Sequence, residues 1–252
     1  MSKPSAEFTP GMGVFETIRV VDGVPLFMAA HLKELGRAMA ALGLETDFDF
    51  EAAQDTLPKL SGRWRWIVIP GKAVTQFTEE PWVDPGTYEL SVSPVRVGSY
   101  NWDARFKTLS HLSHAQAWKM KTTDEVVLLN EYGLMASTSR GNLFWRTKDQ
   151  LFTPAHETGC RRGVIRAFVS QHHEVRSGHH PPTDLREADE IFFTNSMKGI
   201  VSVHAIKGRR FDRNKTADRL REKLQEEIDA QIMTGRVKTS PPPPPPQFPT
   251  LS

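Results

Sequence analysis

The chain has 252 residues, 38% of them hydrophobic and 25% charged, which is enough to bury the core of one large domain or two modest ones. Lys and Arg number 32 against 30 Asp and Glu, and this near balance argues against a nucleic-acid binder, which would carry a concentrated basic excess. Since the chain lacks an apolar run of about 20 residues and a signal-peptide core, we expect a cytoplasmic protein with no membrane segment.

The first elements in chain order are two strands and a helix. GVFETIRV reads as a strand, and Asp22-Gly23 is a hairpin signal before a second strand. In MAAHLKELGRAMAALGL, apolar residues recur after four, three, four and three positions, which predicts an amphipathic helix with one buried face. Gly43 is expected to end that helix.

The rest of the chain predicts a second unit. RWRWIVI and YELSVSPVRV are typical of strands, and we interpret the polar segment 99–105 as a linker between a small α+β domain (residues 1–98) and a larger domain (106–235). The larger domain mixes predicted strands (EVVLLNEYGLMAS, GNLFWRTKDQLFTP and EIFFTNS) with predicted helices (LSHLSHAQAWKMK, GVIRAFVSQHH and TADRLREKLQEEIDAQIM). We expect the last helix to end at Gly235. This mixed order indicates an α+β or α/β fold.

The C-terminal segment 236–252 differs from both units. It contains six consecutive prolines, Pro241 to Pro246, which favour an extended polyproline conformation and exclude helix and sheet. We predict a disordered tail, and a ligand for a proline-recognising domain is the alternative.

Several kinds of catalytic site find little support in the sequence. It carries no Rossmann or P-loop glycine pattern and no G-x-S-x-G motif. The pairs His172-His173 and His179-His180 match no zinc spacing, so we interpret them as exposed loop residues and expect no metal site. Cys160, the one cysteine, precedes two arginines that could lower its thiol pKa, but a lone cysteine is weak evidence for a nucleophile.

Lys107 is the remaining candidate for chemistry. It lies between Phe106 and Thr108, with two leucines following. A lysine amine attacks aldehydes when burial or nearby cations lower its pKa, but local sequence cannot establish either condition. Judged by its neighbours alone, Lys107 is therefore interpreted as a surface charge at the linker, with a nucleophile as the alternative.

The order of six segments favours the second interpretation. GVFETIRV, AHLKEL, KTL, NLFWRTKDQLFTP, RRGVIRAF and ADEIFFTNSMKGIVSV follow one another between Gly11 and Asp212. Together they resemble the fold-type IV pyridoxal-phosphate enzymes, which include branched-chain and D-amino-acid aminotransferases and aminodeoxychorismate lyase. The resemblance implies the two-domain fold of the D-amino-acid aminotransferases, pyridoxal 5'-phosphate in the cleft, a small-molecule substrate and a homodimer.

The resemblance also implies roles for individual residues. The lysine that forms a Schiff base with the cofactor corresponds to Lys107. The phosphate-binding turn corresponds to Gly163-Val164-Ile165-Arg166, where backbone N–H groups at the start of a helix attract an anion. A second phosphate contact corresponds to Thr194-Asn195-Ser196.

Two positions depart from the family pattern. Relatives have an arginine for the cofactor phosphate where this chain has Glu34, and Lys33, Arg37 or Arg140 could replace that cation. Relatives have a glutamate for the pyridine nitrogen where this chain has Ser137, which can donate a hydrogen bond but carries no negative charge.

These departures bear on the expected reaction. A pyridine ring that stays unprotonated withdraws electrons less strongly, which penalises transamination more than elimination. SPVR and NLFWR also resemble aminodeoxychorismate lyase, so we favour that activity, with release of pyruvate and p-aminobenzoate in folate biosynthesis. GVFET resembles the aminotransferases, which remain an alternative. A second alternative is a non-catalytic family member that has lost pyridoxal-phosphate binding.

Overall fold

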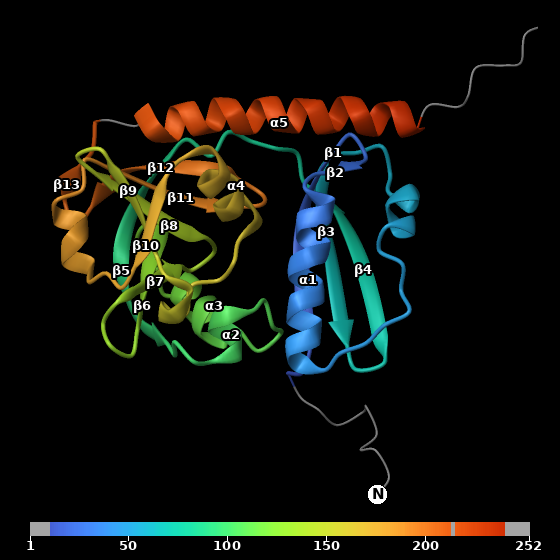
Figure 1. Ribbon diagram of the computed structural model, residues 1–252, viewed down its shortest axis with the longest axis horizontal. Helices are drawn as coiled ribbons and strands as arrows, with labels where there is room; N and C mark the ends of the chain where they lie inside the picture. Colours follow the sequence, from blue (N-terminus) through green and yellow to red (C-terminus); the bar gives the residue numbers. More distant parts are fainter. Residues whose placement is uncertain (1–10, 213–214, 240–252) are drawn as a thin grey trace, which may run out of the picture.

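The computed structural model describes residues 11–212 and 215–239. Figure 1 shows two bodies side by side, with the long helix α5 (Lys215–Thr239) running along one edge of both. The proline run of the predicted tail lies outside the described residues. Among the helices that are described, none has the length and apolar character needed to cross a membrane.

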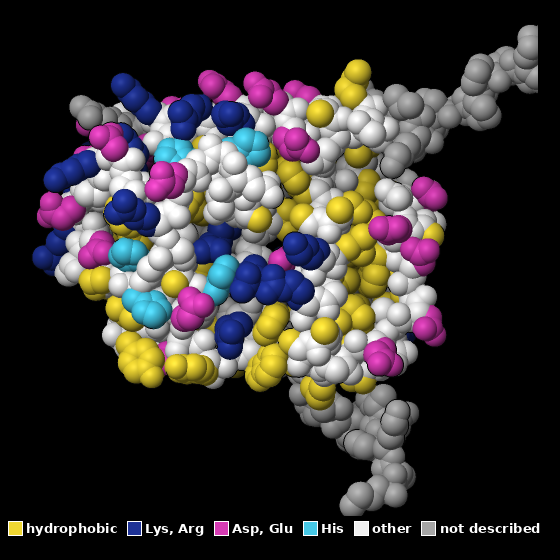
Figure 2. Space-filling view, in the orientation of Figure 1, with side chains coloured by type: hydrophobic (Ala, Val, Ile, Leu, Met, Phe, Trp, Pro, Cys, Tyr) yellow, Lys and Arg dark blue, Asp and Glu magenta, His cyan; other side chains and the backbone are white. Residues whose placement is uncertain are grey.

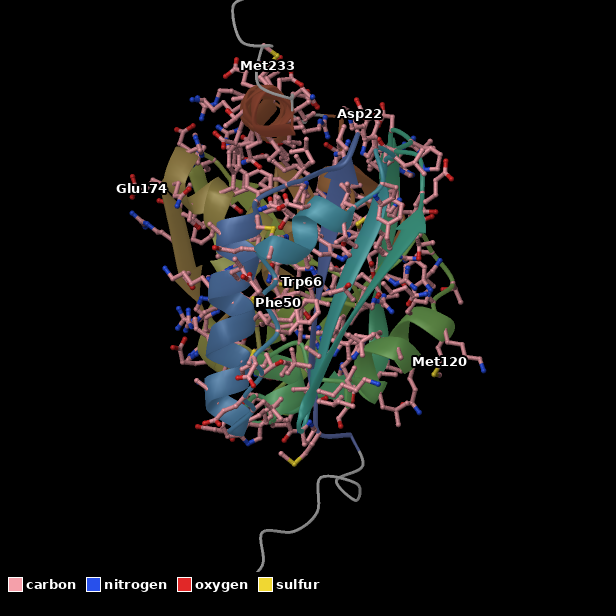
Figure 3. All side chains as sticks on the ribbon, turned by 90° about the vertical axis from the view of Figure 1, so that its right-hand side faces the viewer. Asp22, Phe50, Trp66, Met120, Glu174 and Met233 are labelled. Carbon is pink, nitrogen blue, oxygen red and sulfur yellow. The ribbon has the colours of Figure 1, made fainter. Side chains whose placement is uncertain are left out.

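The first body is a four-stranded antiparallel sheet covered by one helix. The strand order is β2-β1-β3-β4, and the strands are β1 (Val14–Val21), β2 (Val24–Pro25), β3 (Gly62–Ile69) and β4 (Lys72–Glu79). Helix α1 (Met28–Leu42) packs on this sheet, and a short 3-10 helix, η2 (Ala52–Thr56), lies on the connection to β3. Figure 3 shows Phe50 and Trp66 between α1 and the strands, with their ring centroids 4.8 Å apart.

The predicted hairpin and helix of this first body are confirmed. Val21 pairs with Val24 across the Asp22-Gly23 turn. Helix α1 ends at Gly43, which takes the left-handed conformation (φ 64°) that glycine adopts without steric cost.

The second body is built on a nine-stranded sheet. The strand order is β10-β9-β8-β11-β12-β5-β6-β7, with β13 beside β12. The strands are β5 (Thr87–Val97), β6 (Glu125–Asn130), β7 (Met135–Thr138), β8 (Asn142–Thr147), β9 (Gln150–Pro154), β10 (Val175–Gly178), β11 (Glu190–Asn195), β12 (Gly199–Ile206) and β13 (Arg209–Arg210). The helices are α2 (Trp102–Arg105), α3 (Leu112–Lys119), α4 (Val164–His172), η3 (His156–Thr158) and η4 (Pro182–Arg186).

Both faces of this sheet are buried. The neighbours Phe144 and Trp145 on β8 point to opposite faces, as successive residues of a strand must, and each joins a separate apolar cluster. Phe144 packs in the cluster that includes α4 and α5, so these helices cover that face. Strands buried on both faces read as continuous apolar runs, which is why EVVLL and EIFF are recognisable in the sequence.

The change from the first sheet to the second comes earlier than the predicted domain boundary at residue 98. Strand β5 (Thr87–Val97) pairs in parallel with both β6 and β12 of the second sheet. The connection between the sheets is therefore the segment 80–86 that follows β4, and part of the predicted linker 99–105 forms α2. Local sequence predicted β5 as a strand but could not assign it to the second sheet, because its partners β6 and β12 lie further along the chain.

Gly235 does not end the last helix as predicted. Helix α5 continues to Thr239, through residues that the sequence analysis assigned to the tail. At Gly235 the helix passes close to Val24 of β2. A Cβ atom on residue 235 would lie 2.6 Å from Cγ1 of Val24, which is shorter than any normal contact. The glycine therefore permits close packing between α5 and the first body and is not a stop signal.

Two glycine-to-alanine substitutions in helices should have opposite effects on stability. Gly36→Ala in α1 meets nothing within 4 Å, so better helix propensity should raise the free energy of unfolding by about 0.5–1 kcal/mol. Gly235→Ala has the same propensity gain but collides with Val24, and it should lower the free energy of unfolding by about 1–3 kcal/mol. Urea denaturation measures both, and equal shifts would contradict the close packing of α5 on β2.

Candidate active site

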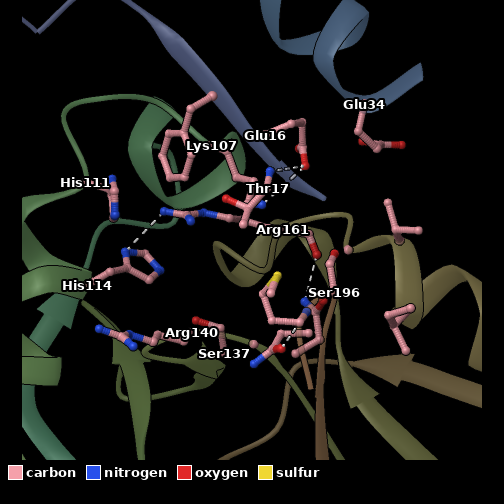
Figure 4. Close-up of a pocket in the computed structure, with 18 of the residues that line it drawn as sticks. Glu16, Thr17, Glu34, Lys107, His111, His114, Ser137, Arg140, Arg161 and Ser196 are labelled. Atoms are coloured by element: carbon pink, nitrogen blue, oxygen red, sulfur yellow. Dashed lines mark hydrogen bonds and ion pairs between the residues drawn. The ribbon is translucent and has the colours of Figure 1, made fainter. Parts of the chain in front are cut away.

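A cavity of about 480 Å³ lies between the two bodies. Figure 4 shows that side chains from the first strand, the first helix and several loops of the second body point into it. The structure brings together most of the site residues assigned from the sequence, and these line the cavity: Lys107, Ser137, Gly163, Val164, Ile165, Thr194, Asn195 and Ser196, together with Glu34 and Arg140. Arg166, the last residue of the predicted phosphate-binding turn, does not line it, because its guanidinium bonds His156 and the carbonyl of Pro154.

The backbone around Lys107 is attached to the edge of the first sheet. Phe15 donates its backbone N–H to the carbonyl of Lys107 at 2.8 Å, and Leu109 donates to the carbonyl of Gly13 at 2.9 Å. Val14 and Thr108 form the bridge between these two hydrogen bonds. The lysine therefore belongs in sequence to the second body but takes its position from β1.

The side chain of Lys107 forms an ion pair with a buried carboxylate. Its Nζ lies 3.2 Å from Oε2 of Glu16, and the lysine side chain is 29% exposed. The same carboxylate oxygen accepts a hydrogen bond from Nδ1 of His31 on α1 at 2.8 Å. Burial raises the pKa of Glu16, but Lys107 and His31 together outweigh burial and bring this pKa down to about 2. Glu16 is thus an anion at neutral pH.

Sequence reasoning missed Glu16 and His31, although both left a signal. Glu16 occupies an inward position of β1, in the series Val14, Glu16, Ile18 and Val20. His31 lies on the buried face of α1 with Leu35. A charged residue in the apolar phase of a strand is rare unless it is paired, so this position could have been singled out.

One end of the cavity is built to accept an anion. Helix α4 begins at Val164, and its N-cap residue, Gly163, supplies no side chain to bond the free N–H groups. A Cβ on residue 163 would lie 2.1 Å from Oδ1 of Asn142, so only glycine fits here. The adjoining turn is held by Asn195, whose side chain accepts the N–H groups of Met197 and Lys198 at 3.1 and 2.8 Å.

Several hydroxyl groups in the cavity have no hydrogen-bond partner within the described residues. They belong to Ser137, Thr138 and Thr194, each of which is no more than 3% exposed. An unpaired buried hydroxyl costs about 1–3 kcal/mol, and such groups usually await a ligand or water. With the uncapped helix terminus, they fit a ligand that has an anionic group at one end and a polar ring atom elsewhere, as pyridoxal phosphate does.

Glu34 occupies the position where the family resemblance predicts an arginine, and several positive charges surround it. Arg37 does not line the cavity, but its Nη1 lies 3.4 Å from Oε1 of Glu34 and pairs with that carboxylate. Burial raises the pKa of Glu34, while the positive charges of Arg37 and Arg162 act in the opposite direction. Arg140, one of the predicted replacement cations, stacks over the Trp118 ring, 3.5 Å from its centroid. Arg162 lines the cavity, and its positive charge acts on Glu34.

Arg161 reaches into the cavity and was missed as a site residue. Its Nη2 donates to the carbonyl of Asp103 at 2.6 Å and lies 3.3 Å from Nδ1 of His114. Burial lowers the pKa of Arg161 to about 10, which leaves the guanidinium charged at neutral pH. Burial, together with the charge of Arg161, lowers the pKa of His114 to about 2, so this imidazole is neutral and accepts the hydrogen bond.

The other candidates from the sequence have structural roles. Burial raises the pKa of Cys160, and this effect outweighs the lowering by Arg166, so the thiol is not activated. His180 packs edge-on against Trp145 and bonds Asp184 at 2.8 Å. Within residues 11–212 and 215–239, no group of three or more His, Cys, Asp or Glu side chains is arranged to hold a metal ion.

Comparison with known proteins places the chain in the class IV aminotransferase family. Residues 13–206 match the family model described as amino-transferase class IV. The chain is 26% identical to the aminodeoxychorismate lyase of Bacillus subtilis, with 77% of each chain covered.

Two solved structures share the fold. The 4-amino-4-deoxychorismate lyase of Pseudomonas aeruginosa superposes with a TM-score of 0.76 at 21% identity, covering 87% of this chain and 92% of that one. The branched-chain amino acid aminotransferase of Escherichia coli also gives 0.76, at 17% identity, with 88% and 87% covered. At such identities these two matches support the fold alone.

The buried ion pair of Glu16 should make stability depend on pH. The folded-state pKa of Glu16 is about 2 and its ordinary value is 4.5, so the carboxylate stabilises the fold fully above pH 4.5 and loses this effect as the pH falls toward 2. Glu16→Gln should lower the free energy of unfolding at neutral pH by on the order of 3 kcal/mol. Urea denaturation across that pH range should show the deficit shrinking toward low pH.

The matched control for this prediction is Glu45→Gln, at an exposed position. It should leave the free energy of unfolding nearly unchanged at every pH. A deficit for Glu16→Gln that is the same at low and neutral pH would contradict the assigned pKa.

Proposed function

Starting from the fact that this chain belongs to the class IV aminotransferase family, we propose that it is a pyridoxal-phosphate enzyme whose cofactor is held by Lys107. Its relatives in that family are lyases and aminotransferases, and its substrate is a small molecule that carries an amino group. The observation that carries this proposal is the cavity, where Lys107 faces an uncapped helix terminus and unpaired hydroxyls.

The proposed contacts to the cofactor use groups that lack partners in the described structure. The backbone N–H groups of Val164 and Ile165 and the hydroxyl of Ser196 would bind the phosphate, with Gly163 allowing its close approach. The hydroxyl of Ser137 would bond the ring nitrogen. When bound, pyridoxal phosphate supplies an aldehyde for the amines and a ring that withdraws electrons from the substrate carbon.

Lys107 would also move a proton during the reaction. Its amino group would remove the proton from the substrate carbon and return it elsewhere. Glu16 remains ionised because its pKa is about 2, so its carboxylate holds the lysine amine in place through the 3.2 Å ion pair. His31 bonds the same carboxylate and keeps it pointed at the lysine.

Among the possible reactions, we favour that of an aminodeoxychorismate lyase, which releases pyruvate and p-aminobenzoate in folate biosynthesis. The relative from Bacillus subtilis carries that name and is matched over most of both chains. Ser137 supports elimination, because a neutral hydroxyl leaves the ring a weaker electron sink than a carboxylate partner would.

A class IV aminotransferase of branched-chain or D-amino acids is the second candidate. The GVFET segment on β1 and the similarity to the D-alanine aminotransferase of Bacillus licheniformis favour it. A non-catalytic member without cofactor is the third candidate, since Glu34 puts a carboxylate in the cavity near the phosphate-binding end.

We also propose the homodimer and the cytoplasmic location that the family resemblance implies. Support for an interface comes from large apolar side chains beside the cavity, where Trp102 is 53% exposed and Leu112 is 66% exposed. Surfaces of this kind are commonly covered by another subunit.

Lys107 should be the residue that becomes modified by the cofactor. Full-length protein incubated with pyridoxal phosphate and then reduced with borohydride should carry a phosphopyridoxyl group on Lys107, detected by mass spectrometry of peptides. The yellow colour of the loaded protein should disappear in Lys107→Ala. The control, Lys119→Ala on exposed α3, should behave like the wild type, and a Lys107→Ala protein that stays yellow would rule out this assignment.

Two substrates, aminodeoxychorismate and an amino acid donor, decide between the candidate reactions. The loaded protein should convert aminodeoxychorismate to equal amounts of p-aminobenzoate and pyruvate, measured by chromatography, and Lys107→Ala should reduce the rate at least about 100-fold. If an amino acid donor instead turns the bound cofactor into its pyridoxamine form, the protein is an aminotransferase. A protein that stays colourless with added cofactor and forms neither product would support the non-catalytic alternative.

A further inference from the structure

Arg161 is a charged group of the cavity that the proposed chemistry leaves without a role. It lies two residues before the phosphate-binding turn, but its side chain extends away from that turn. Figure 4 shows its guanidinium pointing toward His114, on the side of the cavity away from Ser196 and Glu34. Arg161 therefore lies at the opposite side of the cavity from the proposed phosphate-binding turn.

The guanidinium is held firmly but retains unused donors. Nη2 is fixed by the carbonyl of Asp103 and by Nδ1 of His114. Nε is buried and has no partner among the described residues, and no hydrogen bond from Nη1 occurs there. A guanidinium is planar and carries five N–H donors, so an arginine fixed on one side presents its free donors in a defined direction.

His114 is placed to hold Arg161 and not to bind a ligand itself. It lies on the buried side of α3 and is 4% exposed. His111, one turn earlier, directs its Nδ1 to the carbonyl of Thr108 at 3.0 Å and stacks on Phe15, with centroids 5.0 Å apart. Both imidazoles line the cavity with one nitrogen already bonded within the protein, and Arg161 adds the guanidinium at this point.

The charge of the cavity points to an anionic ligand. Eight Lys or Arg side chains line it against three Glu side chains. Lys107 and Arg63 form ion pairs with Glu16 and Glu80, whereas several other lining cations, Arg161 among them, form no ion pair within the described residues. Figure 2 shows Lys and Arg side chains gathered at the junction of the two bodies on one face. A cation without a carboxylate partner in such a place is satisfied by an anion from outside.

From these contacts we propose that Arg161, positioned by His114, binds a carboxylate of the substrate on the side of the cavity away from the phosphate-binding turn. The inference rests on the proposed function in taking the ligand to be a small amine-bearing molecule. Arg161 is then a specificity-determining residue, because a substrate without a carboxylate in that place would leave the guanidinium unpaired.

A pair of probes that differ in one charge tests this role. 4-Aminobenzoate carries a carboxylate, and 4-aminobenzamide replaces it with a neutral amide of the same shape. Isothermal titration calorimetry with the full-length wild-type chain should show about ten-fold tighter binding of the benzoate. Arg161→Gln should reduce this preference to about two-fold or less, while Arg176→Gln, at an exposed position on β10, should keep it.

Two variants of His114 separate positioning from a general effect on folding. His114→Leu removes the acceptor that holds Nη2 and should lose most of the preference for the benzoate. His114→Gln offers a side-chain carbonyl as acceptor and should keep most of it. Equal preferences in these two variants would overturn the positioning role of His114, even if one of them were less stable.

The titrations are repeated with and without pyridoxal phosphate, and absorbance reports the bound cofactor. An unchanged preference in Arg161→Gln overturns the inference whether or not the cofactor binds. A preference that depends on Arg161 in a protein that binds no cofactor supports the inference and contradicts the proposed function. The two hypotheses therefore fail on different measurements.

Discussion

The contact between Lys107 and Glu16 is the interaction on which the site depends. Glu16 is a charged group inside the first body, and a buried carboxylate is tolerated only when cations and hydrogen bonds compensate its lost hydration. Lys107 and His31 provide that compensation, from the segment after β5 and from α1. The lysine is consequently fixed where the two bodies meet, and the cavity forms around it.

Buried carboxylates elsewhere in the described protein have hydrogen-bond partners, unlike several buried hydroxyls of the cavity. Glu190 is 1% exposed, but it accepts the N–H groups of Thr216 and Ala217 at 3.1 and 2.7 Å and so caps α5. Glu125 is equally buried and is bonded by Ser139 and by the backbone of Val126. Against these satisfied groups, the free hydroxyls of Ser137 and Thr194 stand out as places for a ligand.

The departures from the family pattern also become physically intelligible in three dimensions. Glu34 is not an isolated repulsive charge, because Arg37 pairs with it and Arg162 acts on it. Ser137 keeps a free hydroxyl in the cavity. Glu34 places a paired carboxylate and Ser137 a neutral hydroxyl where the resemblance predicts an arginine and a glutamate, while Arg161 adds positive charge at another place.

The sequence by itself determined the local elements and the order of the landmarks. Periodicity and turn residues located β1, α1 and the cap at Gly43, because these depend on neighbours a few positions apart. The ordered segments led to the family and to Lys107, and most of the residues chosen around it line one cavity.

Only the tertiary structure decided which distant groups meet. Glu16 lies 91 positions from Lys107, and His114 lies 47 from Arg161, so no local pattern could pair them. The same limit applies to β5, whose partners in the second sheet are set by packing, and to Gly235, whose small size matters only where α5 passes Val24. Local propensity acts over a few residues, whereas burial and charge compensation are properties of the assembled fold.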